Sequence, residues 1–110
     1  MEIAPGVFVS STQTQEWEPD PEVGGDLHVL CAGVGVDAGM SRMTGPPSEP
    51  IEYSPPGRET LLVLEGSARI EIEGGPTLEL SPGSIASIPA GAKTTWHVTR
   101  PFKEFWVIES

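Results

Sequence analysis

The chain has 110 residues, of which 16 are Asp or Glu and 6 are Lys or Arg, so its formal net charge at pH 7 is −10. This length suffices for one domain with a single core, and the shortage of basic residues excludes a protein that binds nucleic-acid phosphates. The single cysteine, Cys31, excludes an internal disulfide and is expected to be a buried structural residue. With no signal-type or membrane-spanning apolar segment in view, we expect a cytoplasmic protein without a membrane partner. We interpret the acidity as a solubility feature, with selection for a cationic ligand as the alternative.

Residues 1–26 predict an N-terminal arm, and residues 27–110 predict the folded domain. The arm combines short apolar pieces with a polar, acidic link that contains Trp17 and two prolines, Pro19 and Pro21. Such an arm packs across the domain or onto a partner subunit with Trp17 as its anchor. The alternative is a partly ordered tail whose tryptophan only covers an apolar patch.

From Leu27 onward the pattern changes to short strands separated by turns. The chain holds 13 glycines and 12 prolines yet is 37% hydrophobic, which indicates turns rather than disorder. The alternation from Ser67 to Glu73 predicts a half-buried antiparallel strand, and Gly74-Gly75 predicts a hairpin turn after it. Further strands are expected at 27–32, 34–36, 77–80, 84–88, 94–99 and 103–108, with turns at 45–48 and 54–57 and a bulge or corner at Gly39. This spacing predicts an all-β sandwich or barrel.

Two segments, Leu61–Leu64 and Phe105–Ile108, are apolar at consecutive positions. Because neighbouring residues of a strand point to opposite faces, each segment presents an apolar surface outside the barrel as well as inside. The N-terminal arm or a second subunit has to cover the outer surface. We therefore expect a homodimer, since isologous pairing is the commonest closed assembly.

Two stretches carry a recognisable motif spacing: Gly57 to Gly66, and Pro82 to Trp96. The cupin pattern is G-x5-H-x-H-x(3,4)-E-x6-G followed by G-x5-P-x-G-x2-H-x3-N. The residues that fit its frame are Glu59, Gly66, Gly83, Pro89 and Gly91. Residues 27–108 thus resemble the cupin superfamily, and within it the small single-domain group related to the ethanolamine-utilisation cupins. The resemblance implies an all-β, single-domain cupin (RmlC-like jelly-roll) β-barrel.

At the positions where the cupin pattern has metal ligands, this sequence has almost no residues that could bind a metal. The first two histidine positions fall on Glu52 and Ser54, or on Tyr53 and Pro55 with the shorter gap, and the third histidine becomes Thr94. Only Glu59 stands where the resemblance places a ligand. We therefore expect no metal cofactor; the alternative is a weakly bound divalent ion such as Mn²⁺ or Mg²⁺ held by Glu59 with Glu52.

The predicted site lies around Glu59, as a carboxyl that is either hydrogen-bonded to Thr94 or Tyr53 or active as a general acid or base. If Thr94 and Trp96 face the lumen, the Trp96 indole narrows the cavity and its N–H seeks Glu59 or a backbone carbonyl as acceptor. Arg58 and Lys103 are candidates for an anionic ligand at the mouth, with surface ion pairs as the default. His97 is expected to face outward and His28 to be a partly buried strand residue. The predicted ligand-binding residues are Glu52, Tyr53, Arg58, Glu59, Thr94 and Trp96, with Glu59 also the predicted catalytic residue.

Three functions fit these residues. The first is a metal-free or weakly metal-binding accessory or sensor protein that binds a small polar metabolite in a reduced cavity. The second is a small-molecule enzyme in which Glu59 transfers protons or holds a loosely bound divalent ion. Phosphotransfer on acetate is attributed to the ethanolamine-utilisation cupins that this sequence resembles, and the resemblance therefore keeps an enzymatic function open. The third is an interaction protein that acts through its two-sided apolar strands.

Overall fold

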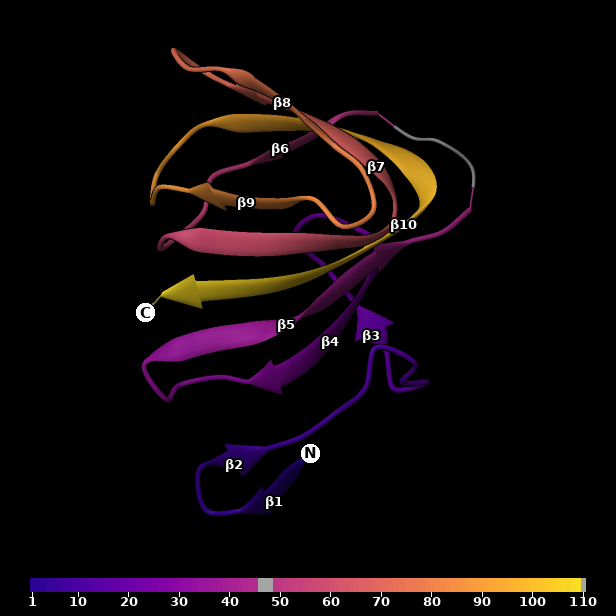
Figure 1. Ribbon diagram of the computed structural model, residues 1–110, viewed down its shortest axis with the longest axis vertical. Helices are drawn as coiled ribbons and strands as arrows, with labels where there is room; N and C mark the ends of the chain where they lie inside the picture. Colours follow the sequence, from indigo (N-terminus) through magenta and orange to yellow (C-terminus); the bar gives the residue numbers. More distant parts are fainter. Residues whose placement is uncertain (46–48, 110) are drawn as a thin grey trace.

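The computed structural model describes residues 1–45 and 49–109, and these residues form strands and turns only (Figure 1). The strands are β1 (Glu2–Ala4), β2 (Val7–Phe8), β3 (Glu18–Pro19), β4 (Asp26–Cys31), β5 (Val36–Met43), β6 (Ile51–Tyr53), β7 (Glu59–Ile72), β8 (Thr77–Leu80), β9 (Ile85–Ile88) and β10 (Thr94–Glu109). The all-β prediction is confirmed. Apart from Gly45, the turn expected at 45–48 falls outside the described residues. Nothing in the described part of the chain forms a helix that could cross a bilayer.

The long strands β7 and β10 organise the molecule because each takes part in two layers. The first half of β7 pairs with β9 and with the second half of β10, which continues through β5 and β4 to β3. The second half of β7 pairs with β8 and with the first half of β10, which also pairs with β6. All these pairings are antiparallel. In the second layer the long strands therefore lie between β8 and β6, and Figure 1 shows this layer above the one that contains β4 and β5.

The expected alternation along β7 is present. Ala68 and Ile70 are buried while Arg69 and Glu71 are exposed, and Leu61 and Val63 continue the buried face in the first half of the strand. Side chains from both halves meet in one core together with Ile88, Trp96 and Phe102 among others. The jelly-roll barrel therefore has a single apolar interior.

We expected separate strands before and after Gly66 and around residues 100–102. Each of β7 and β10 is instead a single strand, but the ladder between them shifts register between Thr99 and Lys103, where the breaks were expected. Gly39 lies in the middle of β5 opposite a register shift of β4 between Val29 and Cys31, in agreement with the bulge expected at this glycine, and a side chain at Gly39 would overlap the His28 carbonyl oxygen. Glycine there permits the close approach of two strands rather than ending one.

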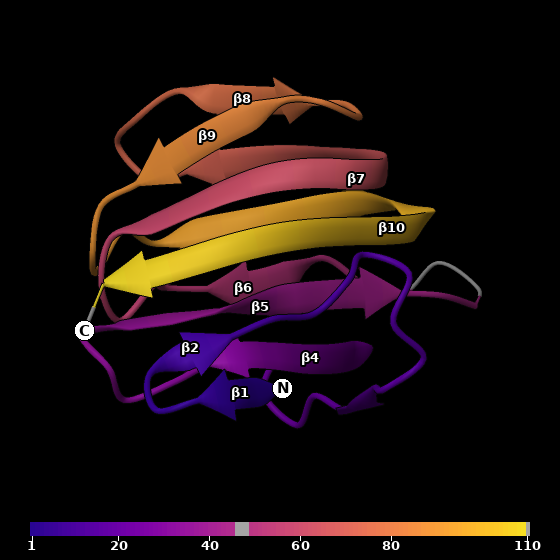
Figure 2. The same cartoon turned by 60° about the horizontal axis from the view of Figure 1, so that its bottom comes forward.

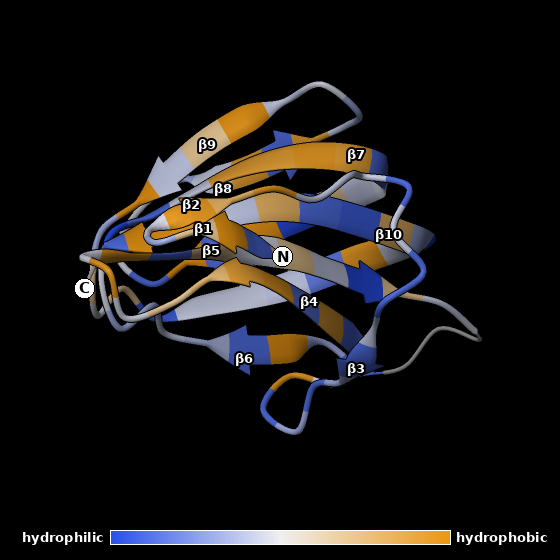
Figure 3. Cartoon of the chain, turned by 90° about the horizontal axis from the view of Figure 1, so that it is seen from below, coloured by the Kyte–Doolittle hydropathy of each residue, from blue (hydrophilic) through white to orange (hydrophobic). Residues whose placement is uncertain are grey.

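The N-terminal β1–β2 hairpin lies at the end of the molecule opposite β8 and β9 and passes over the outer side of β4 and β5 (Figures 1 and 2). Phe8 and Val9 share a hollow with Phe105 of β10, so the arm covers part of the outward apolar surface. The arm nevertheless leaves apolar side chains of its own exposed, among them Ile3 and Val7. Figure 3 shows hydrophobic colouring on the β1–β2 hairpin.

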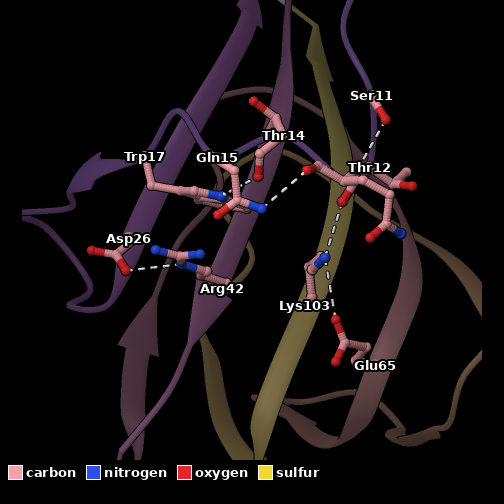
Figure 4. A network of polar contacts seen from close by, with 10 residues as sticks. Ser11, Thr12, Thr14, Gln15, Trp17, Asp26, Arg42, Glu65 and Lys103 are labelled. Carbon is pink, nitrogen blue, oxygen red and sulfur yellow. Dashed lines mark hydrogen bonds and ion pairs between the residues drawn. The ribbon is translucent and has the colours of Figure 1, made fainter.

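Polar contacts tie the rest of the arm to the barrel (Figure 4). The Lys103 ammonium donates to the Thr12 carbonyl oxygen at 3.0 Å and lies 3.2 Å from the Glu65 carboxylate. The Trp17 ring lies under the Arg42 guanidinium, 4.3 Å from its central carbon. Trp17 thus packs against the barrel of its own chain, one of the arrangements expected for this residue.

Candidate functional site

A cavity of about 180 Å³ lies between the layers and is the candidate site. Residues of β4, β5, β6, β7 and β10 line it, together with the loop between β3 and β4. Its polar groups are mainly acidic, namely Asp20, Glu22, Glu59 and Glu104, and its aromatic walls are Tyr53, Trp96 and Trp106. No lysine, arginine or histidine occurs among the described residues that line it.

Glu59 and Tyr53 form the central polar pair. Glu59 begins β7 and is 4% exposed, and the Tyr53 hydroxyl of β6 donates to its carboxylate at 2.6 Å. Burial raises the pKa of Glu59, and the hydrogen bond from Tyr53 opposes that rise. Burial, and then the hydrogen bond to Glu59, raise the pKa of Tyr53. The hydroxyl therefore stays protonated and serves as the donor.

Thr94 and Trp96 lie next to this pair on β10. The Trp96 indole lines the cavity, is 5% exposed, and meets the Tyr53 ring edge-on at 76° with 6.5 Å between ring centres. Its N–H donates to the Thr94 hydroxyl at 3.0 Å, not to Glu59 or a backbone carbonyl as expected. Thr94 in turn donates to the Tyr53 carbonyl oxygen. Thr94 is buried but does not line the cavity, so it orients Tyr53 and Trp96 instead of presenting a polar group to the lumen.

Glu104 is a buried cavity residue that the sequence reasoning missed. It lies on β10 between Phe102 and Trp106 on the inward face and is 4% exposed. Its carboxyl makes no hydrogen bond or ion pair with any residue in the described ranges. Burial raises its pKa well above the ordinary value, and the charge of Glu59 raises it further. Strand alternation was the available signal, since a glutamate two residues from Phe102 and two from Trp106 shares their face.

The loop between β3 and β4 supplies further acidic groups from within the predicted arm. Asp20 fixes the loop, because its carboxylate accepts from the backbone N–H of Glu22 at 2.9 Å and of Val23 at 3.4 Å. Glu22 is exposed and its charge raises the pKa values of both Tyr53 and Glu59. The contribution of this loop was not apparent from sequence because its distance from the motifs is set by the fold.

Glu52 and Arg58 do not reach the cavity, which corrects the expectation for both. Glu52 is exposed on β6 between Ile51 and Tyr53, whose side chains point to the opposite face. Arg58 is exposed and donates to the Ser87 hydroxyl at 3.0 Å. Lys103, also considered for an anionic ligand, is engaged on the outer face as described above.

The histidines lie outside the cavity. Both ring nitrogens of His28 are 2.7 Å from a partner, Nδ1 from the Glu16 carbonyl oxygen and Nε2 from the Ser10 hydroxyl. A carbonyl can only accept, so Nδ1 carries the proton. His97 lies with its Nε2 3.3 Å from the Glu71 carboxylate.

The donor set does not fit the metal that the fold family implies. Zinc, iron, copper and nickel sites need three or more converging ligands, with imidazole preferred. Within residues 1–45 and 49–109 no group of three or more His, Cys, Asp or Glu side chains is close enough to hold a metal ion. Glu59 is also without the second carboxylate, Glu52, that was considered for a loosely held ion.

The jelly-roll barrel and its lumenal cavity define a small protein of cupin type. The sequence matches the EutQ-like cupin domain over residues 38–105, and the chain belongs to this family. The predicted relation to the ethanolamine-utilisation cupins is thereby confirmed.

Solved structures show the same fold at low sequence identity. A putative ethanolamine utilization protein Q from Salmonella typhimurium is 19% identical, with a TM-score of 0.77 over 96% of this chain and 87% of that one. The EutQ protein of Clostridium difficile is 20% identical, with a TM-score of 0.66 over 82% and 65% of the two chains. A putative mannose-6-phosphate isomerase from Ralstonia eutropha is 21% identical, with a TM-score of 0.65 over 91% and 90%. Among proteins of curated function, none matches the sequence.

Proposed function

We propose that this cupin binds a small polar molecule in its lumen and acts as an accessory or sensor-type binding protein. The observation that carries the proposal is a cavity whose walls are largely apolar and aromatic but which contains the Tyr53–Glu59 pair. Small-molecule sites have this composition, in which few polar groups fix the orientation of a ligand that the apolar walls enclose. The cavity volume of about 180 Å³ suits a small ligand.

The alternative is an enzyme in which Glu59 moves a proton. The raised pKa of Glu59 favours this, because a carboxyl whose pKa is nearer to neutrality is a better general acid or base. Binding is the better supported function. Among the described residues that line the cavity, Ser41 is the one serine, cysteine or threonine, and its hydroxyl already accepts a hydrogen bond from the Trp106 indole at 2.9 Å. Cytoplasmic location stays a prediction.

The Tyr53→Phe variant tests lumenal binding, because it removes the hydroxyl and keeps the ring. A small-molecule screen by thermal shift should find compounds that stabilise the wild-type protein. Y53F should bind the same compounds about 3- to 10-fold more weakly, because Glu59 loses the hydrogen bond that holds its carboxylate in place. Thr60→Val, which alters an exposed outward residue of β7, is the control and should bind as the wild type does. Equal weakening in T60V, or none in Y53F, would place the binding site elsewhere.

A further inference from the structure

The cavity has more hydrogen-bond acceptors than free donors. The phenol of Tyr53 donates to Glu59, the indole of Trp96 donates to Thr94, and the indole of Trp106 donates to Ser41. The Glu104 carboxyl receives no hydrogen bond or ion pair from any described residue although it is 4% exposed. A buried polar group without a partner is costly, and such a group facing a cavity points to a ligand that supplies the missing donor.

Charge and aromatic walls indicate what kind of donor fits. The acidic side chains around the cavity have no lysine, arginine or histidine among its described lining residues to balance them. Three aromatic rings line the same space, and the faces of such rings attract cations. The net charge of −10 favours the approach of a cation over that of an anion.

We propose that the lumenal ligand is a small organic cation with a primary ammonium group, which Glu104 and Glu59 bind while the aromatic walls enclose its carbon chain. This inference rests on the proposed binding function and specifies its ligand class. An ammonium group supplies three donors from one centre. It thereby provides the hydrogen bond that Glu104 lacks, and its positive charge offsets the charge of one carboxylate.

An ammonium fits this site better than a divalent metal ion does. A metal ion needs converging ligands in fixed geometry, and the described residues provide no group of three. An ammonium needs acceptors on one side only and tolerates apolar contacts on the other. The cavity of about 180 Å³ holds a chain of four carbons and one nitrogen.

The experiment uses four probes that differ in charge but stay within this size: n-butylamine, 1-butanol, sodium butyrate and magnesium chloride at matched ionic strength. The readout is the indole N–H signals of ¹⁵N-labelled protein, of which the chain has three. Trp96 and Trp106 line the cavity, whereas Trp17 lies outside it and donates to the Thr14 carbonyl oxygen at 2.9 Å. Butylamine at pH 7 should shift the Trp96 and Trp106 signals saturably and leave Trp17 in place.

Three variants locate the interaction. Glu104→Gln and Glu59→Gln should each weaken butylamine binding by at least about tenfold, as expected for loss of a charge-assisted hydrogen bond. Glu79→Gln removes an equal charge from an exposed position on β8 and should bind within about twofold of the wild type, the scale of surface electrostatic effects. The unperturbed signal of Trp17 in each variant checks that the fold is intact.

The outcomes separate the two proposals. If butanol or butyrate shifts the lumenal indoles and butylamine does not, the lumen binds ligands but the ammonium class is wrong. If magnesium alone shifts them, the site is a loose divalent-ion site and the ammonium class is again wrong. If no probe shifts either indole, both the ligand class and the lumenal binding function are overturned.

Discussion

The burial of the single residue Glu104 lowers the free energy of unfolding by an amount that depends on pH. Burial raises its pKa above the ordinary 4.5, so between 4.5 and the folded-state value the folded chain holds a proton that the unfolded chain has lost. The folded state then binds more protons than the unfolded state, and stability falls as pH rises through this window. Glu59 has a raised pKa and acts in the same direction.

Glu104→Gln should therefore stabilise the free protein at neutral pH. The amide keeps the shape and removes the pH-dependent cost of ionising a buried carboxyl, so we expect a gain of about 1–3 kcal/mol in the free energy of unfolding at pH 7. The gain should vanish as the pH falls below 4.5, where the wild-type carboxyl becomes protonated in both states. Urea unfolding at several pH values measures this, with E79Q as the control. Parallel pH profiles for wild type and E104Q would contradict the assignment.

At the scale of the element, Gly66 explains why β7 and β10 can run through both layers. Its φ is +73°, and a side chain there would overlap the carbonyl oxygens of Thr99 and Pro101, where the ladder to β10 shifts register. The motif glycine is thus required by conformation and by space together. Gly74 has φ +72° but no neighbouring atom within 4 Å of an added Cβ.

This pair gives a matched test. Gly66→Ala should destabilise the protein by more than Gly74→Ala. Both substitutions place alanine at a positive φ, but only the alanine at position 66 would also overlap neighbouring backbone atoms. We expect about 1 kcal/mol for G74A and a clearly larger loss for G66A. Chemical denaturation of both variants measures the difference. Equal losses would mean that backbone conformation alone sets the need for glycine at position 66.

The elements also show what could be read from the sequence. The alternation from Ser67 to Glu73 and the hairpin at Gly74-Gly75 depend on local pattern, and both were predicted correctly. The continuity of β7 through Gly66 was not predicted. A glycine that permits the close approach of two strands has the same sequence signature as a glycine that ends a strand. The orientation of Glu52 was missed for a related reason, since a shift of one residue in register turns a side chain to the other face.

At the scale of the whole molecule, the motif spacing was enough to predict the barrel, and it brought Tyr53, Glu59 and Trp96 to one cavity. Glu104 and the loop at Asp20 and Glu22 lie far from the motifs along the chain. Their place in the cavity follows from the pairing of β10 with β7 and of β3 with β4, which the sequence does not specify.

The outward apolar surface supports the predicted homodimer. The arm lies over part of this surface at one end of the molecule, whereas Ile85 of β9, at the opposite end, is 75% exposed beside Leu62. Exposed apolar side chains of this kind are typical of subunit interfaces. Light scattering at micromolar concentration should give twice the chain mass of 11.7 kDa, and Ile85→Lys should lower it. A wild-type mass of one chain would contradict the dimer.

The electron density inside the barrel of crystals grown with n-butylamine tests ammonium binding most directly. We predict one elongated ligand in the lumen, with its nitrogen at hydrogen-bond distance from the carboxyls of Glu104 and Glu59 and its carbon chain against Trp96 and Trp106. A lumen that holds only ordered water, or a metal ion bound by three protein side chains, would contradict it.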